Sequence, residues 1–406
     1  MLDHTSILVV ISLILGSVCA FSVVLVARNF YVEKTKLFQS DIGDDDKRST
    51  PPQKSSVHKE PASEALQEMA NLVFDRGDYK LASSLFNQAL STQEHADKPE
   101  QHNIATALHG RGASLRQLGK LAEAKTVLVR ALDLRERELG PDDPEIAATL
   151  QELAWLAFDS GEYEQAVRLF RRALAIREQA QGPDHLDVAS TLQGLATSLR
   201  QLARTAEAKP LIERALAIRE RALGPDHPAV AATLQELAWL AFDRGDYDRA
   251  VGLFRRAQAI REHAQGPDDP NVATALQGLG ASLRQLGKPG EAKPLLERAL
   301  AIRERALGPD HPAVGALLQE IAWLAFDSGE HQKAADLFSR ALAIREQAQG
   351  PDHLDVASPL QGLAASLRQL GKLAEAKPLS VRWRSASGRL DRIIPRSQRR
   401  YRSWVG

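Results

Sequence analysis

Four histidines recur at one position of a repeated loop, and they are the residues most able to do chemistry in this chain. They are His185, His227, His311 and His353. Imidazoles bind metals, but the ligands must converge within about 2 Å of the ion. These histidines occur once per loop, so neighbouring copies are expected to lie about a repeat apart. We therefore expect no metal site, and interpret Asp226 beside His227 as a helix start.

No other motif indicates catalysis. The sequence has no phosphate-cradling glycine-rich loop, no nucleophile elbow and no HExxH. Acid and amide side chains are plentiful but recur periodically, whereas an active site needs one unique constellation. The single cysteine, Cys19, excludes a disulfide framework and any cysteine-based zinc site. We expect a protein that is not an enzyme and uses no cofactor.

The charge balance gives no indication of a nucleic-acid or acidic-membrane partner. Lys plus Arg and Asp plus Glu each number 52. A chain without net charge has no global field that points to nucleic acid or acidic membranes.

The histidines and the periodic acid and amide side chains belong to a 42-residue repeat. Gly-Pro-Asp recurs at that fixed step, beginning at Gly140, Gly182, Gly224, Gly266, Gly308 and Gly350. A fixed period of this size indicates stacked supersecondary units, each unable to bury its own apolar face alone. The register gives seven complete units and the first half of an eighth. Units carrying LAWLAFD alternate with units carrying LRQL, which makes the true period 84 residues.

Each unit is predicted to be a pair of antiparallel helices. In residues 150–191, apolar residues from Leu150 to Ala157 fall at helical spacing. Gly161 then interrupts the pattern as a C-cap glycine would. A second helical series runs from Ala166 to Ile176 and stops at the next Gly-Pro. The fold class is therefore all-α.

This pattern resembles a known repeat. The matching residues are Leu150, Leu153, Ala154, Gly161, Tyr163, Ala166, Phe170 and Ala173. They look like the tetratricopeptide repeat signature, and the ALAIRE…GPDHP stretch resembles its kinesin-light-chain type, common in bacterial arrays. The resemblance covers residues 63–379. It implies a right-handed superhelix of helical hairpins that binds peptides or proteins on its concave face.

The repeat signature also places particular side chains on that inner face. Tryptophan in one form of the unit alternates with arginine in the other, and both dominate interface hot spots. The candidate groove residues are Trp155, Phe158, Asp159, Arg200, Trp239, Phe242, Asp243, Arg284, Trp323 and Arg368. Alternatively, each tryptophan packs against the neighbouring helix while Arg and Asp pair across adjacent units, at about 0–1 kcal/mol per pair.

A row of glutamines also occupies one inner position of the repeat. They are Gln151, Gln193, Gln235, Gln277, Gln319 and Gln361. They could hydrogen-bond an extended ligand backbone, or they could form a solvated face.

An apolar segment, residues 7–27, follows the short N-terminal segment 1–6. It carries no charge, and about 20 such residues match the thickness of a bilayer core. A single transmembrane anchor is therefore predicted. The alternative is a cleaved signal peptide, because Val18-Cys19-Ala20 looks like a small-residue cleavage site. Cleavage after Ala20 would give an exported, periplasmic protein.

Flanking charge predicts the orientation of that anchor. Arg28, Lys34 and Lys36 follow the span, while Asp3 and His4 precede it. The positive-inside rule therefore places the repeats in the cytoplasm. Residues 28–62 are polar and broken by prolines, which is typical of a flexible tether.

The repeat pattern fails at residue 380. Residues 380–406 form a basic tail with eight arginines between Arg382 and Arg402. Permitted codons from Val381 onward, translated two bases out of frame, give RALAIRERALGPDHPAVAATLQELGW, which matches Arg214–Trp239 except for Gly at Ala238. We interpret the tail as a repeat translated in the wrong frame.

An out-of-frame tail would leave the eighth unit incomplete. The first helix of the eighth unit is expected to lack its partner helix, which would leave Leu363 and Leu367 partly exposed.

The sequence as a whole predicts a single-pass membrane protein. Its cytoplasmic solenoid would be a scaffold that binds a protein or peptide, and neither nucleic acid nor a small-molecule substrate. Two alternatives stay open: the sensor or regulatory half of a multidomain signalling enzyme whose C-terminal effector was lost by frameshift, or an exported periplasmic scaffold.

Overall fold

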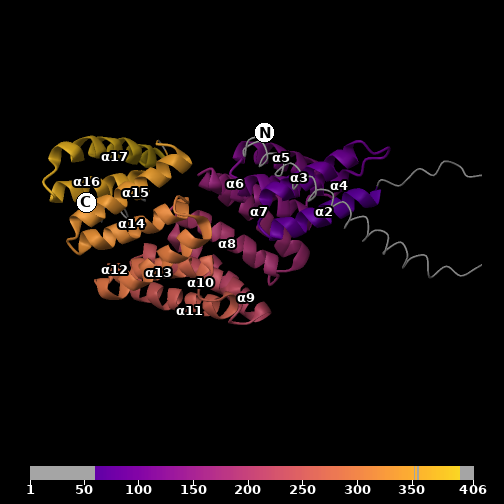
Figure 1. Ribbon diagram of the computed structural model, residues 1–406. Coiled ribbons are helices and arrows are strands. Elements are labelled where there is room, and N and C mark those ends of the chain that lie inside the picture. The colour runs from indigo at the N-terminus through magenta and orange to yellow at the C-terminus, as the bar shows by residue number, and fades with distance from the viewer. Residues whose placement is uncertain (1–59, 352, 354–355, 394–406) are drawn as a thin grey trace, which may run out of the picture. The chain divides into compact units, whose positions relative to one another are not determined.

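Helices alternate in antiparallel pairs along the described chain (Figure 1). The computed structural model describes residues 60–351, 353 and 356–393. These residues form sixteen helices and no strand: α2 (Glu60–Asp75), α3 (Tyr79–Glu94), α4 (Gln101–Gln117), α5 (Leu121–Glu138), α6 (Pro144–Asp159), α7 (Tyr163–Gln181), α8 (Leu186–Gln201), α9 (Thr205–Leu223), α10 (Pro228–Asp243), α11 (Tyr247–Gln265), α12 (Pro270–Gln285), α13 (Pro289–Leu307), α14 (Pro312–Asp327), α15 (His331–Gln349), α16 (Ala357–Gln369) and α17 (Leu373–Ile393).

The first helix of each unit begins and ends as its sequence predicts. In α6, the Asp143 side chain accepts a hydrogen bond from the Glu145 backbone N–H at 2.8 Å, which caps the N-terminus. Pro144 follows in the first turn, where its missing N–H costs nothing. Leu150 and Ala154 on the apolar face are fully buried. Gly161 ends the helix with a positive φ of 75°.

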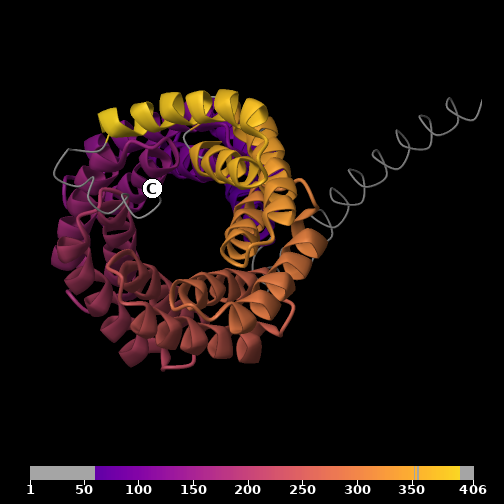
Figure 2. The same ribbon diagram turned by 90° about the vertical axis from the view of Figure 1, so that its left-hand side faces the viewer.

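The helices form two layers. Each even-numbered helix packs against the following odd-numbered helix of its own unit, and each odd-numbered helix packs against the first helix of the next unit. Successive even-numbered helices also contact one another, from α2 with α4 to α14 with α16. Figure 2, seen from the C-terminal side, shows one layer inside the other. The even-numbered helices form the inner layer, since they contact each other as well as their partners.

A close approach of phenylalanine to glycine explains the 84-residue period. On alternate outer helices the rings of Phe86, Phe170, Phe254 and Phe338 are at most 2% exposed. Each ring covers a glycine of the next inner helix: Gly110, Gly194, Gly278 and Gly362. A Cβ at these glycines would lie 2.2–2.4 Å from the ring. One unit along, the corresponding inner residues are Glu152, Glu236 and Glu320. The phenylalanine of one unit form therefore fits against the glycine of the other form, which follows it in the chain.

Ala203 is the one non-glycine residue with positive φ in the described chain, at 57°. Equivalent turns carry Gly161 and Gly245, and an L-residue in this region costs about 1–2 kcal/mol. We expect Ala203→Gly to raise the free energy of unfolding by about 1 kcal/mol, since glycine's greater freedom in the unfolded chain offsets part of the gain. Urea denaturation measures the change. Gly245→Ala is the reciprocal control and should lower stability, and an A203G protein no more stable than wild type would contradict the prediction.

The last unit differs from the expectation that its first helix lacks a partner. α17 packs antiparallel on α16, and Leu367 is only 7% exposed. Trp383 packs onto this cluster and Ala386 is buried, so the tail supplies apolar residues at helical spacing. Arg382 pairs with Glu346 at 2.5 Å, as Arg340 does with Glu304 one unit earlier. The expectation of a missing partner helix and an exposed Leu367 was wrong, because a helix requires suitable spacing rather than the repeat's own residues, whereas Leu363 is partly exposed as expected.

The N-terminal predictions fall outside the described residues. They concern the anchor, residues 7–27, and the tether up to residue 59. Among the helices that are described, none has the length and apolarity needed to cross a bilayer.

Candidate binding face

Three tryptophans lie half-buried on alternate inner helices. Trp155 of α6 packs edge-on against Phe170 of α7, with ring centroids 5.2 Å apart, and against Phe158 at 5.6 Å. Trp239 and Trp323 repeat this arrangement on α10 and α14. Such edge-to-face pairs add about 0.5–1.5 kcal/mol beyond their buried area. Each tryptophan therefore packs against the neighbouring helix, the second helix of its unit, as the alternative to a groove predicted, and keeps part of its surface exposed.

The predicted arginines and aspartates pair across adjacent units. Arg200 of α8 lies 3.2 Å from Asp243 of α10, and Arg284 of α12 lies 2.7 Å from Asp327 of α14. Arg116 and Asp159 form the same pair at 2.9 Å. The Arg–Asp ion pairs across adjacent units, predicted as the alternative to a groove, are therefore confirmed. It does not exclude ligand contact, because the aspartates stay exposed.

Arg368 on α16 differs from these arginines. It is exposed, and within the described residues it has no ion pair, since no further inner helix follows there. The structure thus brings Arg200 together with Asp243, and Arg284 with Asp327, but leaves Arg368 apart.

A row of glutamates that the sequence pattern had not indicated lies beside these pairs. Glu152 accepts from Arg116 Nε at 3.1 Å, and Glu236 lies 3.7 Å from Arg200 Nε. Burial raises the pKa of Glu320, an effect that Arg284 opposes. Partial desolvation by neighbouring side chains likewise raises the pKa of Asp243, although its side chain is still 36% exposed and Arg200 opposes the shift. The signal available in the sequence was the recurrence of these glutamates at an 84-residue step.

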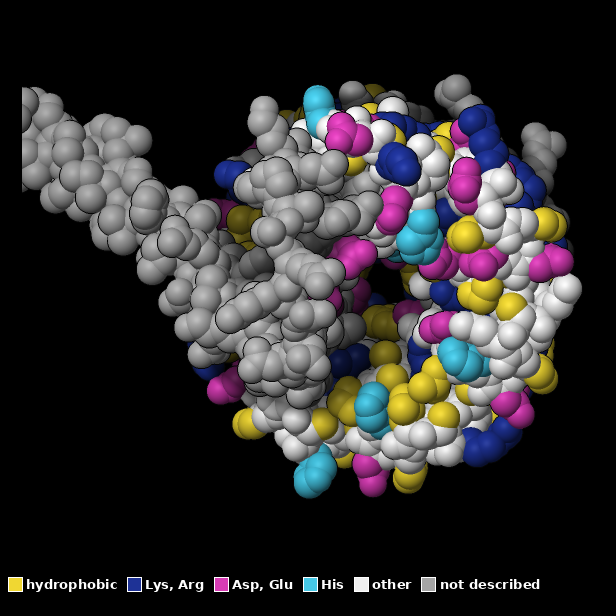
Figure 3. Space-filling model, turned by 90° about the vertical axis from the view of Figure 1, so that its right-hand side faces the viewer, with side chains coloured by type: hydrophobic (Ala, Val, Ile, Leu, Met, Phe, Trp, Pro, Cys, Tyr) yellow, Lys and Arg dark blue, Asp and Glu magenta, His cyan; other side chains and the backbone are white. Residues whose placement is uncertain are grey.

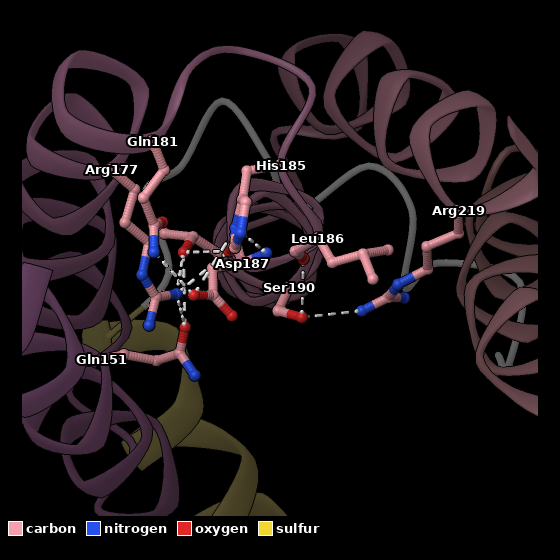
Figure 4. Close-up of polar contacts among 9 residues, drawn as sticks. Gln151, Arg177, Gln181, His185, Leu186, Asp187, Ser190 and Arg219 are labelled. Carbon is pink, nitrogen blue, oxygen red and sulfur yellow. Dashed lines mark hydrogen bonds and ion pairs between the residues drawn. The ribbon is translucent and has the colours of Figure 1, made fainter. Parts of the chain in front are cut away.

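Four glutamines of the row accept hydrogen bonds from buried arginines, so these four carbonyl oxygens do not face solvent or a ligand. Figure 4 shows Arg177 of α7 reaching Gln151 of α6, at 2.5 Å. The same guanidinium donates to the Asp187 carbonyl at 3.0 Å and to Thr191 Oγ1 at 2.5 Å, both on α8. Arg219, Arg261 and Arg303 donate in the same way to Gln193, Gln235 and Gln277. Arg177, Arg219 and Arg303 each join three consecutive helices, whereas Arg261 bonds to Gln235 on α10 and to Gln265 on its own helix. The sequence did not indicate these junctions.

The loop histidines act as helix N-caps. Nδ1 of His185 accepts a hydrogen bond from the Asp187 N–H at 3.2 Å, and His227 and His311 do the same for the residues two positions on. Asp143 and Asp269 provide this cap in other units. After Asp226 a helix begins as expected, but its capping side chain is His227 and not Asp226.

His109 stands at the glutamine position of its unit, facing the buried Arg135. Burial, with the charge of Arg135, lowers its pKa to about 3 from an ordinary 6.5. Its Nδ1 has no hydrogen-bond partner among the described groups. The folded chain therefore keeps this imidazole neutral and leaves its Nδ1 without a hydrogen bond. Both effects lower stability, and a glutamine at this position would avoid them.

We expect His109→Gln to flatten the acid limb of the stability profile. Between pH 6.5 and about 3 the unfolded wild-type chain binds a proton that the folded chain refuses, so its stability falls as pH falls. The variant lacks this loss and gains an acceptor for Arg135. Urea midpoints of both proteins at pH 7.5 and pH 5 measure it. A constant difference between the two proteins at both pH values would show that His109 does not titrate in this way.

These layers define the class of the protein as a helical-hairpin repeat protein with an aromatic and charged inner face. A family model described as tetratricopeptide repeat matches residues 61–133, 103–179, 157–220, 187–263, 241–305, 271–347 and 329–380. The chain belongs to the tetratricopeptide repeat family.

Solved structures resemble this chain to different degrees. A putative kinesin light chain from Podosopora anserina with nearly identical repeats is 27% identical, with a TM-score of 0.42 over 51% of this chain and 97% of that one. The apo quorum sensor NprR from B. thuringiensis is 11% identical, with a TM-score of 0.64 over 88% of this chain and 92% of that one. A Rap protein complexed with competence and sporulation factor is 14% identical, with a TM-score of 0.56 over 82% and 99%. No curated protein matches the chain.

Proposed function

We propose that this protein is a membrane-tethered scaffold that binds a protein or peptide along its inner face. The observation that carries the proposal is the repeated row of half-exposed tryptophans beside inter-unit ion pairs on α6, α10 and α14. Aromatic and arginine side chains dominate binding energy at interfaces. The mechanism is surface complementarity, with no catalytic step.

The Rap protein complexed with competence and sporulation factor supports the proposal, because it shows that a chain with this fold can hold a bound partner. The tether rests on residues 7–27, whose length and apolarity suit a bilayer. Residues 28, 34 and 36 favour a cytoplasmic solenoid. N-terminal sequencing of the mature protein tests the tether: an intact Met1 supports it, whereas Phe21 as first residue supports the exported scaffold.

The binding face is tested by matched arginine variants. Arg200→Ala removes an inner ion pair, whereas Arg256→Ala removes an outer one, to Glu220 at 2.7 Å. Both variants should fold, since neither side chain is buried. Peptides selected from a random displayed library with the wild-type protein should lose about tenfold in affinity for R200A. They should keep their affinity for R256A. Equal losses, or no loss for either variant, would refute the inner face as the site.

A second candidate function rests on the tail. The hidden repeat in residues 380–406 favours an ancestor with further repeats or an effector domain, of which this chain would be the regulatory part. Nucleotide sequencing from the Lys377 codon past the stop tests this. An open shifted frame that enters a catalytic domain supports it, and early closure of that frame contradicts it.

A further inference from the structure

Each tryptophan of the inner face lies between two carboxylates on the same helix. Glu152, Trp155 and Asp159 of α6 have spacings of three and four residues, and such residues are neighbours on one helix face. The same order recurs in α10 and α14. We call these three sets the acidic stripes: Glu152, Trp155 and Asp159; Glu236, Trp239 and Asp243; Glu320, Trp323 and Asp327.

One stripe already holds a cation. The Arg116 guanidinium from α4 lies 3.1 Å from Glu152 and 2.9 Å from Asp159, so it bridges both ends of the α6 stripe. On α10 the corresponding distances from Arg200 are longer, 3.7 Å and 3.2 Å. The two carboxylates of a stripe are therefore placed so that one guanidinium can contact both, as Arg116 does.

The stripe on α14 is the least neutralised of the three. Arg284 contacts Asp327 at 2.7 Å, but no described cation forms an ion pair with Glu320. Each stripe thus carries two carboxylates for one arginine, and Glu320 is the carboxylate left over. Burial raises the pKa of Glu320, although the charges of Arg284 and Arg345 act in the opposite direction.

The stripes lie on α6, α10 and α14, which belong to the inner layer of helices. Figure 3 shows the described unit open at its centre, with hydrophobic, basic and acidic side chains on the wall. A cation placed there meets two carboxylates and an indole. Indoles attract cations by about 0.5–1 kcal/mol at exposed sites, and by about 2 kcal/mol where water is excluded.

We propose that the inner face selects a cationic peptide segment, whose lysine or arginine side chains enter the acidic stripes, the α14 stripe first. The proposal rests on the proposed scaffold function and names its ligand chemistry. The outer layer offers no such preference, because its carboxylates and arginines alternate one to one. Examples are Glu178–Arg214, Glu220–Arg256 and Glu262–Arg298, at 2.5–2.7 Å.

Two synthetic peptides of equal length, alternating Ser-Lys and alternating Ser-Glu, test the proposal. Fluorescence anisotropy at low salt should show the Lys peptide bound at least about tenfold tighter than the Glu peptide. Glu320→Gln with Asp327→Asn should weaken the Lys peptide by about tenfold. Glu262→Gln with Asp268→Asn removes the same formal charge away from the stripes: Glu262 lies on the outer helix α11, and Asp268, in the loop after it, pairs with Arg305 at 3.2 Å. This control variant should leave binding unchanged.

The outcomes separate the inference from the scaffold function. Equal weakening by the inner and outer double variants would mean non-specific attraction and would overturn the inference. Tighter binding of the Glu peptide, lost in R200A, would overturn cation selection while leaving the inner face as a binding site. Binding of neither peptide would also overturn cation selection, and the library selection then decides independently whether the inner face binds anything.

Discussion

Phe254→Ala is expected to lower the free energy of unfolding of the central repeats by about 3–5 kcal/mol. Phe254 is fully buried, packs 5.1 Å from the Trp239 ring and covers Gly278 of α12. Removing the ring leaves a cavity between three helices, and a close-packed interior relaxes only partly into such a space. Chemical denaturation combined with hydrogen exchange of α10–α12 measures the loss, because a solenoid opens locally.

The glycine opposite this ring provides the sharper test. A Cβ on Gly278 would lie 2.2 Å from Phe254, so Gly278→Ala should cost about 1–3 kcal/mol by overpacking. Gly252→Ala on α11 is the matched control. No atom lies within 4 Å of its new methyl group, and helix propensity should make it stabilising by about 0.5–1 kcal/mol.

Shape complementarity predicts that the two positions are coupled. In Phe254→Leu the smaller side chain leaves room for the methyl group, so adding Gly278→Ala should cost much less than it does beside phenylalanine. The interaction energy from a double-mutant cycle should reach about 1 kcal/mol or more. Additive effects of the two substitutions would contradict a direct ring-to-glycine contact.

The second large effect concerns the buried arginines. Arg177→Ala should destabilise its units by about 3 kcal/mol, because Gln151, Thr191 and the Asp187 carbonyl lose a charged donor inside the protein. Arg172→Ala, on the same helix, removes only an exposed ion pair to Glu136 and should cost about 0–1 kcal/mol.

Arg177→Lys distinguishes fork geometry from charge. Lysine keeps the charge but cannot present several donors in one plane, so it should recover only part of the loss. Unfolding free energies of the three variants give the comparison. A lysine variant as stable as wild type would show that the positive charge alone accounts for the stabilisation. Equal losses of unfolding free energy in R172A and R177A would show that the buried hydrogen bonds of Arg177 contribute no more than an exposed ion pair.

Much of the fold could be predicted because repetition amplifies weak local signals. One Gly-Pro is a weak turn signal, but six at one step establish the helix boundaries, and Gly161 ends α6 where the sequence placed it. The end of the array could not be predicted this way. Residues 380–393 depart from the repeat, yet their small and apolar side chains still fit against α16 as α17.

The binding face could be predicted only in part. The inner position of Trp239 and Asp243 followed from the repeat, and the pairing of Asp243 with Arg200 was one of two interpretations. The glutamine row was misjudged because its partner, the ALAIRE arginine, lies 26 residues away in the sequence. Only packing brings the two together.

The helical hairpin and its caps could be predicted from the sequence because they depend on residues within one or two turns of each other, and the 84-residue alternation is visible there as a repeat. Only the stacking of the units shows what the alternation does. Phenylalanine fills the space left by glycine on the next helix, buried arginine joins three helices, and the acidic stripes gather along one inner layer. Those relations depend on side chains from separate units, whose distances arise only when the units stack.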